Sequence, residues 1–537
     1  MHDVSNIREM DFLCTLSSNN HQIIHHMASQ RNGEPQTAAK QPRVIRPMSH
    51  NEAYHSALHV LRQSAATVVA CHYRLPEELT GRGSFEAVQD AFHRAMALTV
   101  LEHPMLQVGI LNEDSAVPSW IELDSVDLSA HIEWEEVKPS QDRVARSREV
   151  TLYQLDTFFA DVESKPGWRM SVLREEGNLS SLEVIFSWNH ANVDGVSGKI
   201  FHQSLLRNLN DPRINEELPS LKGTVLHLES VADRFPPPPE SLVNIPISLT
   251  FALSTIWKER RPPFLVWGDS THATWAPIRE EPYKTQFRTF SVDDATVKKV
   301  VSACREHKTT IAGLLHALPL ASLALQLDEG KEHYKEDAKT MHAITALDTR
   351  RFMPTKPKEY PWHVPERTMD NELSLSFHMF GSKLLTEIRS KAKGASSENE
   401  IMNVLKDIVW SAAAKTRQEI QEKLDNGMNN DLLGLMKFVP DWRAQKMSQL
   451  KKPRGSAWGV SNLGTLDGEV EGPGWKIERA VFQLSCEITS PVFHISSISV
   501  KGRELCVDVS WQEGVINEAI GDKLAEDMEA WLRFLGA

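Results

Sequence analysis

The chain has 537 residues, of which 41% are hydrophobic and 24% are charged. This balance is that of an ordinary globular protein, and it excludes fibrous, collagen-like and wholly disordered classes. At roughly 150 residues per domain, the length predicts two to four domains, or two large ones. The 59 basic and 72 acidic side chains give a net charge of −13, which argues against broad nucleic-acid binding but permits a local basic pocket for a small anion.

The cysteines and the apolar segments point to a cytoplasmic protein. The cysteines are odd in number, widely spaced and without a C-x-x-C pair, so we interpret them as reduced thiols and expect neither a disulfide framework nor a metal site. No apolar run reaches the ~20 residues of a membrane-spanning helix, and no secretory signal is recognisable. The five cysteines are Cys14, Cys71, Cys304, Cys486 and Cys506.

The first 210 residues contain a polar leader followed by mixed helices and strands. Residues 1–40 carry no sustained hydrophobic period and are predicted to be a disordered leader, with Met27 as an alternative start. Residues 41–210 are predicted to form an N-terminal subdomain. Its expected helices cover 51–61, 85–100, 144–157 and 196–209, and its expected strands cover 66–73, 105–110, 120–123, 131–134, 169–173 and 182–189.

A proline-rich stretch separates this region from a second one. Residues 211–285 contain four consecutive prolines at 236–239 and show little alternation, so we expect a long crossover that is partly extended. Residues 286–537 are predicted to form a C-terminal subdomain, and the order of elements predicts the α/β class with mixed sheets. The expected helices here cover 293–307, 310–326, 399–424 and 517–535, and the expected strands cover 286–291, 341–347, 457–460, 475–484, 492–499 and 505–510.

The segment SWNHANVDG at 187–195 is the strongest candidate for chemistry. An apolar strand delivers His190, whose imidazole titrates near neutral pH and therefore suits a general base. Asp194 follows four residues later at the start of a predicted helix, where a carboxylate caps free main-chain N–H groups. We expect Gly195 to permit the main-chain angles needed where the strand becomes a helix.

Two interpretations of this motif stay open. With 22 histidines, and with Asp and Gly each at about 5%, only about 0.06 chance matches to H-x-x-x-D-G are expected in the chain. On the alternative interpretation, His190 is a histidine at the edge of the core and Asp194 is a plain helix cap.

The segment resembles the active-site motif of the H-x-x-x-D acyltransferase superfamily, whose fold is that of chloramphenicol acetyltransferase. The chain is most similar to the fungal alcohol acetyltransferases and to condensation domains, although Asn189 stands where the fungal enzymes often have a first histidine. The plant signature D-F-G-W-G is absent, and VSNLG at 460–464 resembles a late Ser-Asn-x-Gly element of the fungal branch. Weaker similarities at 98–110 and 348–354 extend the resemblance over about residues 50–515.

The resemblance implies two chloramphenicol acetyltransferase-like subdomains, each a mixed sheet flanked by helices, with an active-site tunnel between them. Acyl-CoA, above all acetyl-CoA, would be a co-substrate that is not permanently bound, and an alcohol would be the acceptor. His190 would act as the base at the middle of the tunnel. Asp194 would hold the loop, and its implied partner is Arg350.

Several further residues are candidates for contacts with the reactants. A tetrahedral oxyanion needs a hydrogen-bond donor, which Ser461 or Asn462 would supply unless they form only a turn between strands. The phosphates of CoA need cations, which Lys451, Lys452 and Arg454 would supply unless this run is simply solvated. Thr309 opens a predicted helix whose N-terminus would meet the pantetheine arm, the alternative being a simple helix cap.

The sequence thus predicts a CoA-dependent O-acyltransferase, specifically an acetyltransferase acting on an alcohol in fungal secondary metabolism. One alternative is a condensation-type enzyme that uses a carrier-bound acyl donor or forms an amide. The other is a non-catalytic binding module that retains the fold. The expected partners are the two small-molecule substrates, with no nucleic acid and no membrane span, and the protein is expected to act as a monomer.

Overall fold

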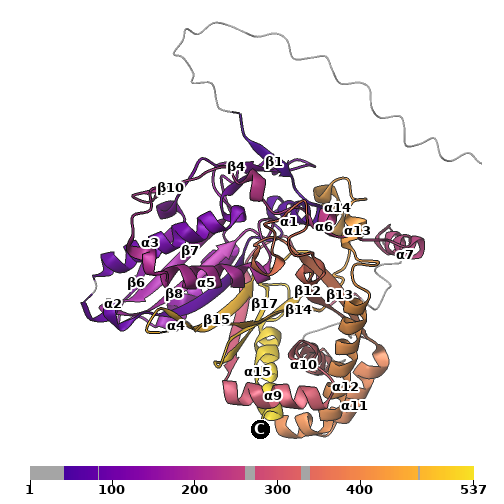
Figure 1. The fold of residues 1–537 in the computed structure, drawn as a ribbon. Helices are drawn as coiled ribbons and strands as arrows, with labels where there is room; N and C mark the ends of the chain where they lie inside the picture. The colour runs from indigo at the N-terminus through magenta and orange to yellow at the C-terminus, as the bar shows by residue number, and fades with distance from the viewer. Residues whose placement is uncertain (1–40, 83, 261–271, 328–338, 470–471) are drawn as a thin grey trace, which may run out of the picture. The chain divides into compact units, whose positions relative to one another are not determined.

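The computed structural model describes residues 41–82, 84–260, 272–327, 339–469 and 472–537 (Figure 1). Contacts divide the chain into two units, Met1–Gln41 and Pro42–Ala537, and the second contains the sheets and helices. The predicted leader at 1–40 lies outside the described residues. The second unit contains mixed sheets flanked by helices, which confirms the predicted α/β class.

The first large sheet has five strands in the order β15-β2-β8-β7-β6. Four of them come from the first half of the chain, whereas β15 comes from its last eighty residues and pairs antiparallel with β2. The predicted subdomains, 41–210 and 286–537, did not include this pairing of a late strand with the first sheet. The strands are β2 (Thr67–Arg74), β6 (Ile132–Val137), β7 (Trp168–Glu175), β8 (Asn178–Trp188) and β15 (Lys476–Leu484).

The second large sheet has six strands in the order β11-β17-β16-β14-β12-β13. Its centre is parallel, because β14 pairs in parallel with both β12 and β16, while its outer pairs are antiparallel. The strands are β11 (Thr285–Val292), β12 (Met341–Asp348), β13 (Leu373–Phe380), β14 (Trp458–Leu466), β16 (Phe493–Val500) and β17 (Leu505–Gln512).

Helices cover the two sheets and form two large hydrophobic cores (Figure 1). In the first half, α3 (Phe85–Glu102) and α5 (Gly195–Leu209) pack on each other, and α5 also contacts β2. In the second half, α10 contacts both α12 and α15, and residues on every side of α10 are buried. The helices of this half are α9 (Asp294–Glu306), α10 (Ile311–Gln326), α11 (Ser382–Ala392), α12 (Glu398–Asp425), α13 (Leu433–Met436), α14 (Trp442–Gln449) and α15 (Glu518–Leu535).

Shorter elements complete the described part of the chain. Two three-stranded sheets have the orders β1-β4-β3 and β5-β10-β9, so part of the proline-rich crossover pairs with the first half. The strands are β1 (Val44–Pro47), β3 (Val108–Leu111), β4 (Ser119–Glu122), β5 (Ser125–Asp127), β9 (Leu221–Lys222) and β10 (Val225–His227), and the helices are α1 (His50–Val60), α2 (Glu77–Arg82), α4 (Arg143–Asp156), α6 (Pro239–Leu242) and α7 (Leu249–Arg260).

Within the described residues, no single helix is long and apolar enough to cross a membrane. The helix pair α9 and α10 passes a test of length and composition when taken together, but the two helices meet at 91°. The buried surroundings of α10 explain its apolar composition, because a helix that is hydrophobic all round is typical of a protein core.

Candidate active site

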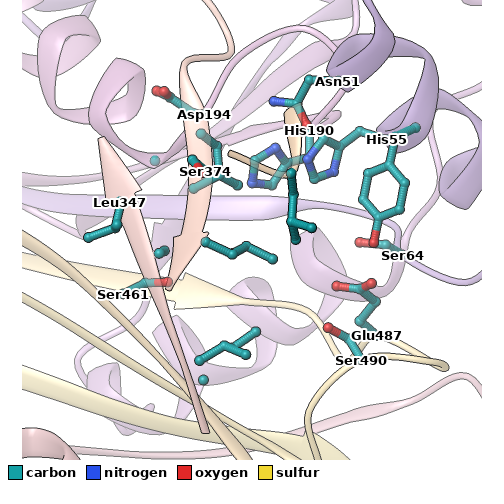
Figure 2. Close-up of a pocket in the computed structure, with 18 of the residues that line it drawn as sticks. Asn51, His55, Ser64, His190, Asp194, Leu347, Ser374, Ser461, Glu487 and Ser490 are labelled. Carbon is teal, nitrogen blue, oxygen red and sulfur yellow. The ribbon is translucent and has the colours of Figure 1, made fainter. Parts of the chain in front are cut away.

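A cavity of about 380 Å³ contains the imidazole of His190 (Figure 2). Its walls come from segments that are far apart in the sequence. They include α1, the loop between β8 and α5, strands β12, β13 and β14, the loop between β15 and β16, and α14. Both large sheets therefore contribute to the walls of one cavity.

His190 lies in the loop that follows the buried strand β8. The main chain here is fixed, because the Trp188 side chain donates to the Val193 carbonyl over 2.8 Å. The Asn371 side chain donates to the His190 carbonyl over 2.6 Å, and it accepts in turn from the Asn51 side chain on α1 over 3.0 Å. Three separate segments thus hold the position from which the imidazole projects.

The imidazole of His190 stacks on a second imidazole, that of His55. The ring centroids are 4.1 Å apart and the planes differ by 9°, and Figure 2 shows the two rings face to face. His55 belongs to α1, whose first turn is fixed by a reciprocal capping box between Ser49 and Glu52. The stack restricts the rotation of His190 and leaves one ring edge toward the cavity.

Burial keeps both imidazoles neutral. Desolvation lowers the pKa of His190, and the nearby negative charge of Asp194 and Glu487 only partly offsets this. Desolvation, with the adjacent His190 and Lys446, lowers the pKa of His55 well below its usual range. The Nδ1 atom of His190 is buried and has no partner among the described residues, so Nε2 is the nitrogen available to a reactant. A neutral imidazole with a free nitrogen is ready to accept a proton.

Asp194 lines the cavity, but its carboxylate is engaged in a buried ion pair. It is the N-cap of α5, where it accepts from the Ser197 main-chain N–H over 2.9 Å. The two terminal nitrogens of Arg350 donate to its two carboxylate oxygens over 2.6 and 3.1 Å. The main-chain N–H of Glu372 donates to it over 3.0 Å. The structure therefore brings together Asp194 and Arg350, which the resemblance paired.

Arg350 is surrounded by more carboxylates than it can neutralise. Besides Asp194, it donates to Asp370 over 2.5 Å and to Asp348 over 3.2 Å. Arg350 holds the pKa of Asp194 below its usual range despite burial. Desolvation instead raises the pKa of Asp370 to about 7, and it raises that of Glu372 well above its usual range. The single guanidinium is therefore matched mainly to the Asp194 carboxylate.

Gly195 fulfils a steric role, not the conformational one predicted. It is not among the residues with positive φ, so an ordinary side chain would tolerate its main-chain angles. A Cβ atom here would lie 2.9 Å from the Phe482 ring and 3.0 Å from the Leu463 side chain. Glycine is needed because α5 begins directly against strands β15 and β14.

Ser461 and Asn462 both line the cavity from strand β14. They are strand residues and not members of a simple turn, and Figure 2 shows Ser461 across the cavity from His190. The side-chain oxygen of Asn462 accepts from the Gly464 main-chain N–H over 2.8 Å, at a bulge where Gly464 has a φ of 69°.

The three predicted phosphate ligands have different environments. Arg454 is 1% exposed, and one of its terminal nitrogens donates to the carbonyls of Glu487 and Ser490 over 3.3 and 2.8 Å. This burial corrects the prediction for Arg454, because its guanidinium fixes the β15–β16 loop and is closed to CoA. Lys451 is exposed and Lys452 is half-buried, and both follow α14, whose Gln449 lines the cavity.

Thr309 lies away from the cavity, which corrects its predicted contact with pantetheine. Its hydroxyl donates to the Ala413 carbonyl on α12 over 2.8 Å, and the residue is 6% exposed. The hydroxyl is also 2.5 Å from the position that a Cβ of Gly313 would take. Thr309 thus joins α10 to α12, and Thr310 provides the N-cap of α10.

Sequence reasoning missed several residues of the site, among them His55, Asn371 and Glu487. They carry no local motif, since each becomes part of the site only through tertiary contacts. The signal that was available is the sequence DNE at 370–372, where three polar residues precede the β13 strand. In the described residues, no group of three or more His, Cys, Asp or Glu side chains is arranged to hold a metal ion.

Comparisons with known proteins agree with this geometry. A family model described as alcohol acetyltransferase matches residues 130–369, which include both His190 and Arg350. The probable alcohol acetyltransferase FCK4 of Fusarium pseudograminearum is 27% identical over 92% of this chain and 96% of its own length. The probable alcohol acetyltransferase crmB of Aspergillus fumigatus is 24% identical over 84% of this chain and 91% of its own length.

Solved structures share the fold at low sequence identity. TRI3 trichothecene 15-O-acetyltransferase from Fusarium sporotrichioides superposes with a TM-score of 0.65 at 12% identity, covering 91% of this chain and 95% of its own. Together, these comparisons support an O-acyltransferase. The condensation domain of the Monacolin K polyketide synthase MokA superposes with a TM-score of 0.53 at 11% identity, covering 91% and 97%.

Proposed function

We propose that this H-x-x-x-D acyltransferase transfers an acetyl group from acetyl-CoA to the hydroxyl of an alcohol in fungal secondary metabolism. The observation that carries the proposal is the neutral imidazole of His190, stacked on His55 and facing a cavity of about 380 Å³. The family model and the two fungal relatives support an alcohol as the acceptor.

The reaction follows from the position of this base. His190 takes the proton of the acceptor hydroxyl as the oxygen attacks the thioester carbonyl. The resulting tetrahedral oxyanion accepts a hydrogen bond from Ser461 or Asn462, which line the cavity from β14. The intermediate then collapses to the ester and breaks the carbon–sulfur bond. The protonated His190 returns its proton to the leaving thiolate, so the base is regenerated.

The Asp194–Arg350 pair has a positioning role in this proposal. Its atoms are buried among the main-chain groups of α5 and of residues 370–372, and it makes no contact with the His190 ring. It fixes the loop that carries His190 to the segment that carries Asn371. The carboxylate therefore acts on the base through the geometry of the loop.

For the donor, Lys451 and Lys452 stay candidates for the CoA phosphates. They follow α14 directly, at the edge of the cavity wall that includes Gln445 and Gln449. If they bind phosphate, a Lys451→Ala, Lys452→Ala variant will raise KM for acetyl-CoA and leave KM for the acceptor unchanged. An unchanged donor KM at low salt would return both lysines to a solvated surface.

A thiol-release assay tests the proposed function. Purified protein is given acetyl-CoA with a panel of alcohols and amines, and free CoA thiol and the acetylated product are measured. We expect ester formation that depends on the alcohol. Transfer only from an acetyl group on a carrier-protein phosphopantetheine, or only to amines, would establish the condensation-type alternative, towards which the similarity to MokA points. No transfer from either donor would leave a binding module.

A further inference from the structure

A carboxylate, that of Glu487, projects into the same cavity and is not used by acetyl transfer. Glu487 lies in the loop between β15 and β16 and lines the cavity with Ser64 and Ser490. Figure 2 shows the Glu487 carboxylate on the side of the cavity away from Asp194. A charged side chain in a cavity wall that the reaction does not require needs its own explanation.

The loop that carries Glu487 is held rigidly. The buried guanidinium of Arg454 donates to the main-chain carbonyls of Glu487 and Ser490. At the start of the loop, the Ser485 hydroxyl accepts from the Tyr283 hydroxyl over 3.0 Å. These contacts fix the main chain on both sides of Glu487, so the direction of its side chain is set before any ligand arrives.

Two cations already lie near Glu487, the ammonium of Lys446 and the guanidinium of Arg454, although the hydrogen bonds of the carboxylate are incomplete. The ammonium of Lys446 lies 3.9 Å from Oε1, which is an ion-pair distance beyond the range of a hydrogen bond. Oε1 has no hydrogen-bond partner among the described residues, and Oε2 likewise accepts none within them. Burial lowers the pKa of the neighbouring His190, His55 and His494, so these imidazoles add no positive charge. A further cation would leave the site with excess positive charge, whereas a neutral donor would complete it.

The rest of the cavity is predominantly apolar. Its apolar walls fit a hydrocarbon skeleton, and polar side chains such as Ser374 and Gln445 lie at separate points among them. Apolar side chains in these walls include Leu347, Leu373, Leu375, Leu435, Met436 and Val439.

From this arrangement we infer that the acceptor is an apolar molecule with at least two hydroxyl groups, one presented to His190 and the other donating to the carboxylate of Glu487. This rests on the proposed function and deepens it by naming the acceptor class. Glu487 is then a specificity-determining residue, because an acceptor without the second hydroxyl leaves a half-buried carboxylate without a donor.

A series of linear alcohols tests the inference. The probes are 1-decanol and decanediols in which the spacing between the two hydroxyls increases, each assayed with acetyl-CoA for kcat/KM. In wild-type protein we expect at least one diol to exceed 1-decanol by ~10–100-fold, as a hydrogen bond to a charged group provides. In Glu487→Ala we expect that advantage to disappear while 1-decanol changes less than about threefold. Glu487→Gln, which preserves the shape, should retain part of the advantage.

Controls separate this inference from the proposed function. Glu478→Ala removes a carboxylate paired with Arg74 outside the cavity, and it should leave the diol preference intact. Calorimetric binding of the preferred diol without acetyl-CoA should weaken in Glu487→Ala even if no acetyl transfer is detected. Melting curves identify a variant that fails to fold. If Glu487→Ala fails to fold, the diol preference of Glu487→Gln tests the inference instead. The inference would be overturned if wild-type and Glu487→Ala proteins preferred the diol over 1-decanol to the same extent, or if Glu487→Ala lost as much kcat/KM on 1-decanol as on the diol. It would also be overturned if wild-type protein preferred 10-amino-1-decanol to every diol.

Discussion

The two ends of the H-x-x-x-D motif lie in opposite kinds of environment. Asp194 accepts five hydrogen bonds, from Arg350, Ser197 and Glu372, and every one of them is buried. His190 has a stacked neighbour and a fixed main chain, but its ring nitrogens accept nothing from another described residue. A side chain that stabilises the fold has all its hydrogen bonds satisfied within the protein, whereas a side chain that reacts with a substrate needs an atom without a partner in the protein.

This difference leads to different expectations for substitutions at the two ends. Changes at the His190 end should alter turnover and leave the free energy of unfolding nearly unchanged. Changes at the Asp194 end should lower stability first and turnover as a consequence. Substitutions at each end test whether stability and turnover separate in this way.

The largest expected effect is the loss of turnover in His190→Ala. Removing the base should lower kcat by ~10²–10⁴-fold, because general-base catalysis contributes that much. The melting temperature should stay close to that of wild type, since the ring makes no hydrogen bond that the fold requires. His227→Ala, at an exposed position on β10, is the matched control and should retain full turnover. Near-normal turnover in His190→Ala would contradict the assignment of the base.

The next largest effect is expected at the buried ion pair. Asp194→Asn and Arg350→Ala should each lower the free energy of unfolding by about 3–5 kcal/mol, because one buried charge loses its partner. Arg351→Ala removes the exposed neighbouring arginine and should change stability by less than about 0.5 kcal/mol. Denaturant unfolding of the single and double variants forms a cycle that should show strong coupling between Asp194 and Arg350. An Asp194→Asn variant that is inactive but as stable as wild type would assign the carboxylate a chemical role.

A smaller effect is expected from filling the space at Gly195. Gly195→Ala places a methyl group 2.9 Å from the Phe482 ring and should destabilise by about 1–3 kcal/mol, as overpacking does. Gly455→Ala is the control, since a Cβ there meets nothing within 4 Å. Phe482→Leu should restore part of the stability of Gly195→Ala in thermal unfolding. If Gly195→Ala is neutral, or if Phe482→Leu has no compensating effect, the steric account of this glycine fails.

Local patterns in the sequence predicted most of the long helices and strands, and the motif with its strand and helix, but not helices α11 and α14. The strand before His190 and the cap at Asp194 depend on neighbouring residues only, so period and capping rules were sufficient. Strand β13 was missed because its alternation is inverted. Ser374, Ser376 and His378 face the interior, whereas Phe377 and Met379 are more than half exposed. A rule that places apolar residues inside cannot identify such a strand.

The resemblance supplied one tertiary contact, that of Asp194 with Arg350, but other residues that depend on tertiary contacts could not be predicted from the sequence. Arg454 belongs to a basic run, but it folds inward because two carbonyls of the β15–β16 loop need a donor. His55 lies 135 positions before His190 and meets it only because α1 packs beside the loop that follows β8. No local pattern encodes either contact, so Arg454 was taken for a phosphate ligand and the stacked imidazole of His55 was overlooked.

The pH dependence of kcat/KM tests most directly the claim that a neutral, buried His190 is the base. Only the unprotonated imidazole accepts a proton, so the rate falls as pH decreases through the pKa of His190. Because burial lowers that pKa, the acidic limb should lie below pH 6.5, with about a tenfold loss per unit beneath it. Asp370→Asn, which removes a carboxyl whose pKa burial raises to about 7, should leave the midpoint in place. A midpoint above 6.5, or a rate that rises as pH falls, would contradict the account.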